Sequence, residues 1–283
     1  MSDTNDAGLS LAPAQITWYI PVCMKNKLNK ELAVCGFEAV KALERNSPDK
    51  IQRLYFTADR AAQFGDLCRS MAKRKAPYNQ VESGTELEKL CGSVHHQGVV
   101  AMIPQPEILR LSPADVDKWV QNGEDVLMLD KVGNANNVGA IIRSAAFFDV
   151  KNIVIPLDEA QAGITTSAYR VAQGGMEKVR VYSVKSMEAL IRDAKGKFAV
   201  FGTDVRGSNS ITKMGSLRKK KRSDGTEKLL PAMIVLGNEE RGISREISEL
   251  CDYLVTIPSD AGNMESLNVA QAAAVILYEL KRR

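Results

Sequence analysis

The most constraining feature of the chain is the regular alternation of apolar, strand-type runs with helix-forming segments over its second half. The run Val126–Leu129 precedes a predicted helix at 135–148, and Asn152–Pro156 precedes another at 167–172. Strands that alternate with helices in this way form a parallel sheet covered on both faces, so the fold class is α/β. Ligands of such sheets bind beyond the carboxyl ends of the strands. The loops of most interest are therefore those after Leu129, Gly202, Leu236 and Ile257.

A shorter α/β segment precedes this one. Phe37, Val40 and Leu43 have helical spacing, and strand-type runs are predicted at 51–56 and 98–103. Prolines and polar residues then interrupt the pattern before the second half begins. We predict a loose tail at 1–30, a small domain at 31–104, a linker at 105–122 and a second domain at 123–283.

Composition excludes several classes of protein. Of 283 residues, 45% are hydrophobic and 25% charged, which excludes a disordered chain or a fibre. No apolar run reaches the ~18 residues of a membrane helix, and the start lacks a secretory pattern, so no membrane contact is expected. The 5 cysteines include no C-x-x-C pair, which favours a reducing cytoplasm and gives no metal-site spacing. The net charge of +4 permits an anionic partner without requiring one.

Asparagine and glycine crowd the loop and helix start at 131–146. Asn137 can cap the helix, and Gly139 permits close approach of another backbone. Arg143 follows inside an otherwise apolar helix, where an unpaired charge is costly, so a specific anion is expected beside it. The alternative is a salt bridge to an acid elsewhere in the fold.

Two further loops follow strand-type runs. In the first, Gly237 opens a glycine-rich turn that suits a nucleotide edge bound by backbone groups, although such turns are common in α/β folds. In the second, Ser266 and Asn268 stand at the start of the closing helix, predicted at 266–281. Both residues are also good N-caps for purely local reasons.

In this order and spacing, the three loops resemble motifs one, two and three of the SpoU, or TrmH, branch of the SPOUT RNA methyltransferases. The N-x-G-x-x-x-R motif is matched by Asn137, Gly139 and Arg143. The second motif is matched by Gly237, Asn238, Glu239 and Gly242, and the third by Ile257, Pro258, Ser266, Leu267, Asn268 and Val269. The segment 33–104 is similar to the substrate-binding domain of the RlmB-like members, and the match is closest to the YfiF-type branch.

The resemblance implies transfer of a methyl group from S-adenosyl-L-methionine to a ribose 2′-hydroxyl in tRNA or rRNA. It also implies a deep trefoil knot in the parallel sheet domain, a ribosomal-protein-like RNA-binding domain before it, and a homodimer whose site uses both subunits. The catalytic residues that it implies are Arg143, Asn137, Glu239, Ser266 and Asn268. Thr203, Leu236, Gly237, Ile257 and Leu267 are implied to bind the cofactor.

Family accounts often make the arginine a general base, but its pKa above ~12 makes it a poor one. We expect Arg143 instead to hold the adjacent phosphate and stabilise the developing alkoxide. An alternative function is a catalytically silent RNA-binding or ribosome-assembly factor of the same fold. The intact motif residues favour the enzyme, and the separate first domain disfavours a small-molecule methyltransferase.

Two stretches depart from the family pattern. The third loop is one residue longer around Gly262, and the connection at 203–230 is also longer. That connection carries the basic run 218–222. Such a run is either a mobile arm that contacts RNA phosphates or a solvated surface loop.

Overall fold

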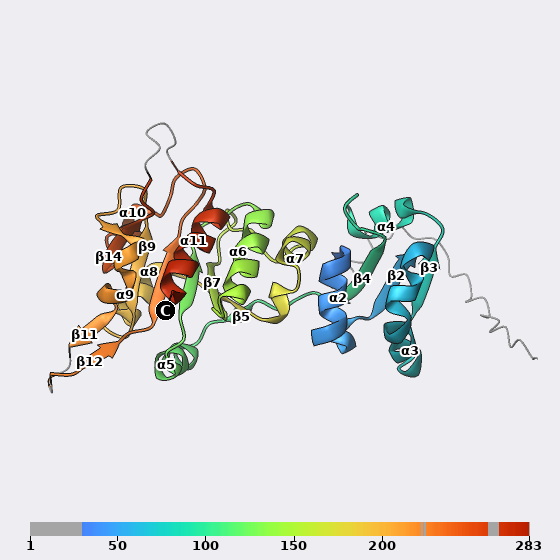
Figure 1. Cartoon of the computed structure of the whole chain (residues 1–283), viewed down its shortest axis with the longest axis horizontal. Coiled ribbons are helices and arrows are strands. Elements are labelled where there is room, and N and C mark those ends of the chain that lie inside the picture. The colour runs from blue at the N-terminus through green and yellow to red at the C-terminus, as the bar shows by residue number, and fades with distance from the viewer. Residues whose placement is uncertain (1–29, 222, 224, 260–265, 283) are drawn as a thin grey trace, which may run out of the picture.

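The computed structural model describes residues 30–221, 223, 225–259 and 266–282, and it forms two α/β units (Figure 1). The predicted tail, apart from Lys30, and Gly262 lie outside the described residues. The smaller unit has four strands in the order β1-β4-β2-β3, and β4 is antiparallel to both neighbours. Its elements are β1 (Glu31–Cys35), α2 (Phe37–Asn46), β2 (Arg53–Thr57), α3 (Gly65–Lys73), β3 (Tyr78–Val81), α4 (Gly84–Cys91) and β4 (Val99–Pro104).

The alternation of side chains along β4 explains how helices come to cover both faces of the smaller sheet. Val99, Ala101 and Ile103 pack in one apolar cluster with residues of α2 and α3. Val100 and Met102 point to the other face, where they pack with residues of α4. Two small cores thus lie on either side of a single sheet.

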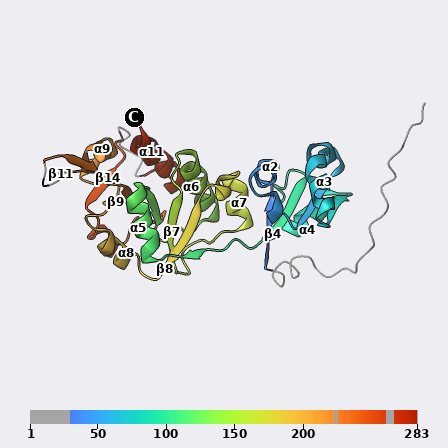
Figure 2. The same ribbon diagram turned by 90° about the horizontal axis from the view of Figure 1, so that it is seen from below.

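The larger unit is an eight-stranded sheet in the order β10-β14-β9-β13-β6-β7-β8-β5, and every pairing in it is parallel. Helices cover both of its faces, as the two views show (Figures 1 and 2), which confirms the predicted fold class. None of the described helices is long and apolar enough to cross a membrane. The strands are β5 (Leu109–Arg110), β6 (Val126–Leu129), β7 (Asn152–Pro156), β8 (Arg180–Val184), β9 (Ala199–Thr203), β10 (Asn209–Ser210), β13 (Ala232–Leu236) and β14 (Tyr253–Thr256).

The helices of the larger unit divide between two apolar cores. The core of α6 (Ala135–Phe147) and α11 (Val269–Lys281) lies on one face, and that of α5 (Pro113–Asn122) and α8 (Met187–Ala194) on the other. The short helices α7 (Thr166–Ala172), α9 (Met214–Leu217) and α10 (Arg245–Ser248) complete the cover. The closing helix begins at Val269 rather than at 266.

Residues 105–122, predicted as a linker, contain a strand and a helix that pack on the larger unit. Strand β5 joins the edge of the larger sheet beside β8, and α5 contributes Val116 and Trp119 to a core of that sheet. Helix α5 begins with a capping box between Ser112 and Asp115, and Pro113 occupies its first turn, where proline is tolerated. The boundary between domains stays a prediction, now with β5 and α5 assigned to the second domain.

The two units contact each other through α7 and the short helix η3 (Gly175–Glu177) that follows it. Tyr169 of α7 is buried against the core of the smaller unit, and its hydroxyl donates to Glu177 Oε1 at 2.7 Å. Burial raises the pKa of this Glu177 carboxyl. Gln105 Nε2 also donates to the carbonyl of Ile164 at 3.3 Å.

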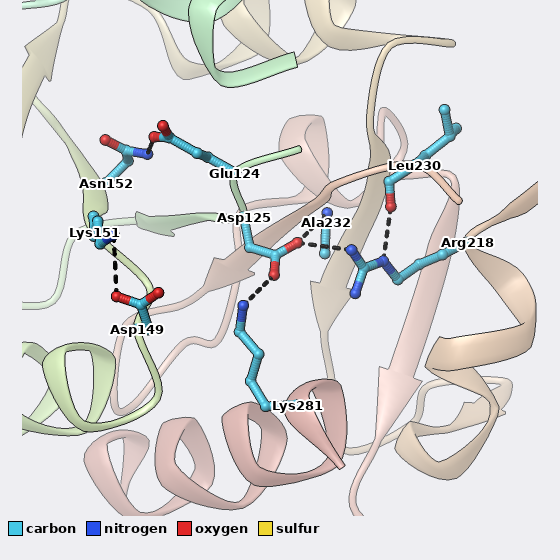
Figure 3. Close-up of polar contacts among 9 residues, drawn as sticks. All are labelled: Glu124, Asp125, Asp149, Lys151, Asn152, Arg218, Leu230, Ala232 and Lys281. Carbon is cyan, nitrogen blue, oxygen red and sulfur yellow. Dashed lines mark hydrogen bonds and ion pairs between the residues drawn. The ribbon is translucent and has the colours of Figure 1, made fainter. Parts of the chain in front are cut away.

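A buried ionic cluster ties together the amino-terminal ends of two central strands (Figure 3). Asp125, just before β6, accepts from Arg218 Nη2 at 2.9 Å, from Lys281 Nζ at 2.7 Å and from the Ala232 amide of β13 at 2.7 Å. Asp125 and Arg218 are only 6% and 9% exposed, so each charge depends on the other for compensation. We call these residues the Asp125 cluster. It joins β6, β13 and the end of α11.

Replacing the carboxylate should therefore destabilise the larger unit. We expect Asp125→Ala to lower the free energy of unfolding by about 3 kcal/mol, because the buried Arg218 guanidinium loses its counter-charge. Asp117→Ala is the control, since this carboxylate is exposed on helix α5 and pairs with exposed Lys197 at 3.4 Å. It should change stability by less than about 1 kcal/mol in urea unfolding. Equal losses in the two variants would contradict the assigned role of the cluster.

Candidate active site

The three motif loops meet beyond the carboxyl ends of the parallel strands of the larger sheet. Asn137, in the first turn of α6, donates through Nδ2 to Glu239 Oε1 at 2.7 Å. Asn268, just before α11, donates through Nδ2 to Asn137 Oδ1 at 3.1 Å. Asn137 is thus the shared partner that connects one residue from each of the other two loops.

Local chemistry at the two helix starts explains how this contact forms. Asn134, rather than Asn137 as predicted, caps α6 by accepting from the Asn136 amide at 2.8 Å. Asn137 lies within the helix, and its side-chain amide is left available to the neighbouring loops. Asn268 does cap α11, since its Oδ1 accepts from the Ala270 amide at 2.9 Å. The cap and the contact with Asn137 use different atoms of Asn268, so its local and its site roles coexist.

The second loop is held by side chains outside the predicted site residues. Asn238 Oδ1 accepts from the amides of Glu240 and Arg241 at 3.0 and 3.1 Å. Its Nδ2 donates to the Lys131 carbonyl of the first loop at 2.9 Å. Asp130 is buried and accepts from the Ser244 amide at 2.8 Å. The position of Asp130 directly after a buried strand was the available sequence signal for this role.

Gly237 stands at the point where β13 ends, and it leaves no space for a side chain. A Cβ there would lie 2.1 Å from the backbone carbon of Gly242, which exchanges two hydrogen bonds of 2.9 Å with Asn238. Although Gly237 is buried, neither its amide nor its carbonyl forms a hydrogen bond with any residue that the structure describes. A donor and an acceptor of the backbone are therefore available at this strand end.

The other residues predicted to bind a cofactor lie around this point. Leu236 is buried at the end of β13, and Thr203 ends the neighbouring strand β9. Thr203 Oγ1 donates to the Val235 carbonyl at 3.0 Å. Ile257 is half-buried after β14, whereas Leu267 is 43% exposed. Ser266 is exposed, and no hydrogen bond links it to the asparagine residues within the described chain.

Arg143 is exposed on α6, and its side chain forms no hydrogen bond or ion pair with any described residue. The alternative of a salt bridge within the fold is therefore not observed in the described part of the chain. The backbone around it is closely packed. A Cβ on Gly139 would lie 2.4 Å from the Ala168 carbonyl oxygen, and one on Gly175 would lie 3.1 Å from Arg143 Cα. A fixed helix thus presents a free guanidinium.

The site therefore offers backbone groups without a partner in the described chain, a carboxylate, two amide side chains and, on the same helix as Asn137, an exposed guanidinium. This set suits the binding of polar and anionic groups at the edge of the sheet. Among the described residues, no group of three or more His, Cys, Asp or Glu side chains is placed to hold a metal ion.

Comparisons with known proteins match both units. Residues 124–278 match the SpoU rRNA Methylase family, and residues 33–109 match the RNA 2'-O ribose methyltransferase substrate binding family. The chain is 33% identical over 251 residues to the 23S rRNA (guanosine-2'-O-)-methyltransferase RlmB of Acinetobacter baylyi. That alignment covers 88% of this chain and 96% of the relative.

Two solved structures share the fold. The SpoU methyltransferase AviRb from Streptomyces viridochromogenes, in complex with the cofactor AdoMet, has a TM-score of 0.65 at 22% identity and 92% coverage of both chains. The AdoMet-bound rRNA methyltransferase from Sinorhizobium meliloti has a TM-score of 0.67 at 22% identity, with 92% of this chain and 90% of that chain covered. At these identities the likeness concerns the fold.

The packing at Gly237 generates a prediction about stability. We expect Gly237→Ala to lower the free energy of unfolding by at least about 2 kcal/mol, because the backbone around Gly242 must move to admit the methyl group. Gly215→Ala is the control, since nothing lies within 4 Å of that site and it falls in helix α9. It should be neutral or slightly stabilising in urea unfolding. A neutral Gly237→Ala would show that the turn has room to relax.

Proposed function

The chain belongs to the SpoU rRNA methylase family, as its three motifs indicated, and we propose that it transfers a methyl group from S-adenosylmethionine to a ribose 2′-hydroxyl of ribosomal RNA. The observation that carries this proposal is the contact of Asn137 with Glu239 and Asn268, which joins the three motif loops at one edge of the sheet. The enzyme is an RNA 2′-O-methyltransferase, and rRNA rather than tRNA is favoured by relatives such as RlmB.

The residues at the end of β13 fit the proposed cofactor. The amide and carbonyl of Gly237, which form no hydrogen bond with a described residue, offer the donor and acceptor that an adenine edge requires, beside apolar Leu236, Ile257 and Leu267. Thr203 lies on the neighbouring strand end. S-adenosylmethionine, when bound, supplies a methyl group that is already activated on a sulfonium. The protein then has mainly to position the ribose and favour loss of its hydroxyl proton.

We assign to Arg143 the task of favouring loss of the hydroxyl proton. Its guanidinium is exposed, unpaired within the described chain and carried by a closely packed helix, so it is free to bind an RNA phosphate through two donors. In this position it stabilises the negative charge that develops on the ribose oxygen as the hydroxyl proton passes to solvent and the methyl carbon exchanges its bond to sulfur for one to that oxygen. Asn137, Glu239, Ser266 and Asn268 shape the space in which the ribose is held.

We further propose a homodimer in which a second subunit completes the site. Helices α6 and α11 lie side by side (Figure 1), and a hydrogen bond between Asn137 and Asn268 connects their amino-terminal ends. Large apolar side chains stay exposed on both helices: Phe147 is 81% exposed on α6, and Tyr278 is 58% exposed on α11. Exposed apolar residues on adjacent helices favour an isologous contact, which would bring Arg143 of α6 to the interface.

The knot is also part of the proposal. Strand β14 lies beyond β9 and β13 from β6, yet α11, which follows it, packs beside α6. We propose that the chain passes back to α6 by threading through a loop, which forms the trefoil knot.

The free thiols of the described cysteines support a cytoplasmic location.

Methyl transfer to unmodified rRNA tests the proposed activity directly. With labelled S-adenosylmethionine, we expect the wild type to place label on ribose, and Arg143→Ala to lose at least about a hundredfold in kcat with cofactor binding unchanged. Arg143→Lys should recover only part of the loss, because it keeps the charge without the paired donors.

The outcomes separate the alternatives. Near-wild-type activity of Arg143→Lys would contradict the phosphate-holding role. RNA binding without cofactor binding or transfer would instead identify a silent RNA-binding or assembly factor.

Light scattering tests the second subunit. Phe147→Glu introduces a charge on the exposed apolar face, so we expect it to convert a dimer to a monomer and abolish methyl transfer. Val94→Glu is the control for oligomeric state, because Val94 is 66% exposed but lies in the smaller unit. A dimeric Phe147→Glu protein would place the interface elsewhere.

A further inference from the structure

The long connection between β9 and β13 contains β10, α9 and a β-hairpin rather than a loose loop. The hairpin has the strands β11 (Lys219–Lys221) and β12 (Glu227–Leu229), and it projects from the larger unit at the end away from the smaller one (Figures 1 and 2). In the antiparallel register, Lys220 stands directly opposite Lys228. Like charges in directly opposed positions destabilise a hairpin. A hairpin that places this pair face to face favours an anionic ligand that offsets the repulsion.

The surroundings of Lys220 add to the positive charge. Lys220 Nζ donates to the carbonyl of Gly196 at 3.4 Å, which places it beside exposed Lys195 and Lys197. Lys197 pairs with Asp117 at 3.4 Å, and on the hairpin itself Glu227 pairs with Lys219 at 3.3 Å. Asp117 and Glu227 therefore offset the charge of only Lys197 and Lys219. On this surface, four exposed lysines have no ion pair with a described residue: Lys195, Lys220, Lys221 and Lys228.

The base of the hairpin is anchored in the interior. Arg218, which begins the basic run, is buried rather than available to a ligand, and it donates to the Leu230 carbonyl at 2.8 Å and to Asp125 at 2.9 Å (Figure 3). The Leu230 amide donates to the Arg218 carbonyl at 2.9 Å, so the two residues close the hairpin at its base. The basic run therefore has two parts. Arg218 is buried and anchors the hairpin, whereas Lys219–Lys221 form an exposed basic surface. Arg222 lies outside the described residues.

We propose that the hairpin face formed by Lys220 and Lys228, together with Lys195, binds the phosphate backbone of the RNA substrate. Lysine ammonium groups bind phosphates as point charges without reading sequence, and several on one ordered surface supply salt-dependent affinity. The hairpin leads through Leu230 directly into the start of β13, whereas the active site lies beyond the other end of that strand. It therefore contacts RNA away from the methylated nucleotide. This inference rests on the proposed function for the identity of the RNA.

The test compares RNA binding by the full chain and two matched variants. Lys220→Gln/Lys228→Gln removes both charges, and Lys220→Arg/Lys228→Arg retains them at the same positions. Binding of a labelled, unmodified 23S rRNA transcript is measured at about 50 to 200 mM salt, the range over which phosphate contacts are most apparent. We expect the glutamine variant to weaken binding on the order of tenfold at the low-salt end and to reduce the slope of log Kd against log salt by about 1.4 to 1.8. The arginine variant should bind as the wild type does.

Methyl transfer gives an independent readout. We expect the glutamine variant to raise the KM for RNA while kcat at saturating RNA and the affinity for S-adenosylmethionine stay unchanged. If neither the wild type nor the variants transfer a methyl group, the proposed function fails. The binding comparison still decides the role of the hairpin in that case. Unchanged RNA binding by the glutamine variant overturns the inference, as does a wild type that binds no rRNA. Competition by polyglutamate as strong as that by rRNA would also overturn it, because it would assign the surface to acidic proteins.

Discussion

The parallel pairing of β6, β13, β9 and β14 is the constraint on which the site depends. Because parallel strands end at the same edge of a sheet, loops that are far apart in the sequence must emerge beside one another there. Side-chain amides then fix their arrangement, with Asn137 bonded to Glu239 from the second loop and to Asn268 from the third. The chemistry that we propose depends on this convergence of loops more than on any single residue.

The Asp125 cluster lies at the opposite end of the sheet, where β6 and β13 begin, and it holds the chain in place there. Helix α11 is held at both ends, by Asn268 at the active site and by Lys281 at Asp125. The same carboxylate binds Arg218, so the interior charge that secures α11 also anchors the basic hairpin. We thus propose that one end of the sheet serves the chemistry and that the other holds the chain and contacts RNA.

The sequence predicted much of the fold because buried parallel strands read as continuous apolar runs, and Val126–Leu129 and Asn152–Pro156 match their predicted bounds. Helix α5 was missed because Pro113 was interpreted as a breaker, although the capping box at Ser112 was a usable signal. Arg218 could not be separated from its basic neighbours, since its partner Asp125 is 93 positions away in the chain. Likewise, Asn134 and Asn137 are equivalent as caps until the start of the helix is known.

The most direct test of this account is a crystal structure of the full chain with S-adenosylmethionine and an RNA fragment. We expect the cofactor's adenine at the free backbone groups of Gly237, and Arg143 from a second subunit beside the ribose that receives the methyl group. The account would be contradicted by a cofactor bound away from the end of β13. It would equally be contradicted by a guanidinium of Arg143 that contacts neither the RNA nor the reacting ribose.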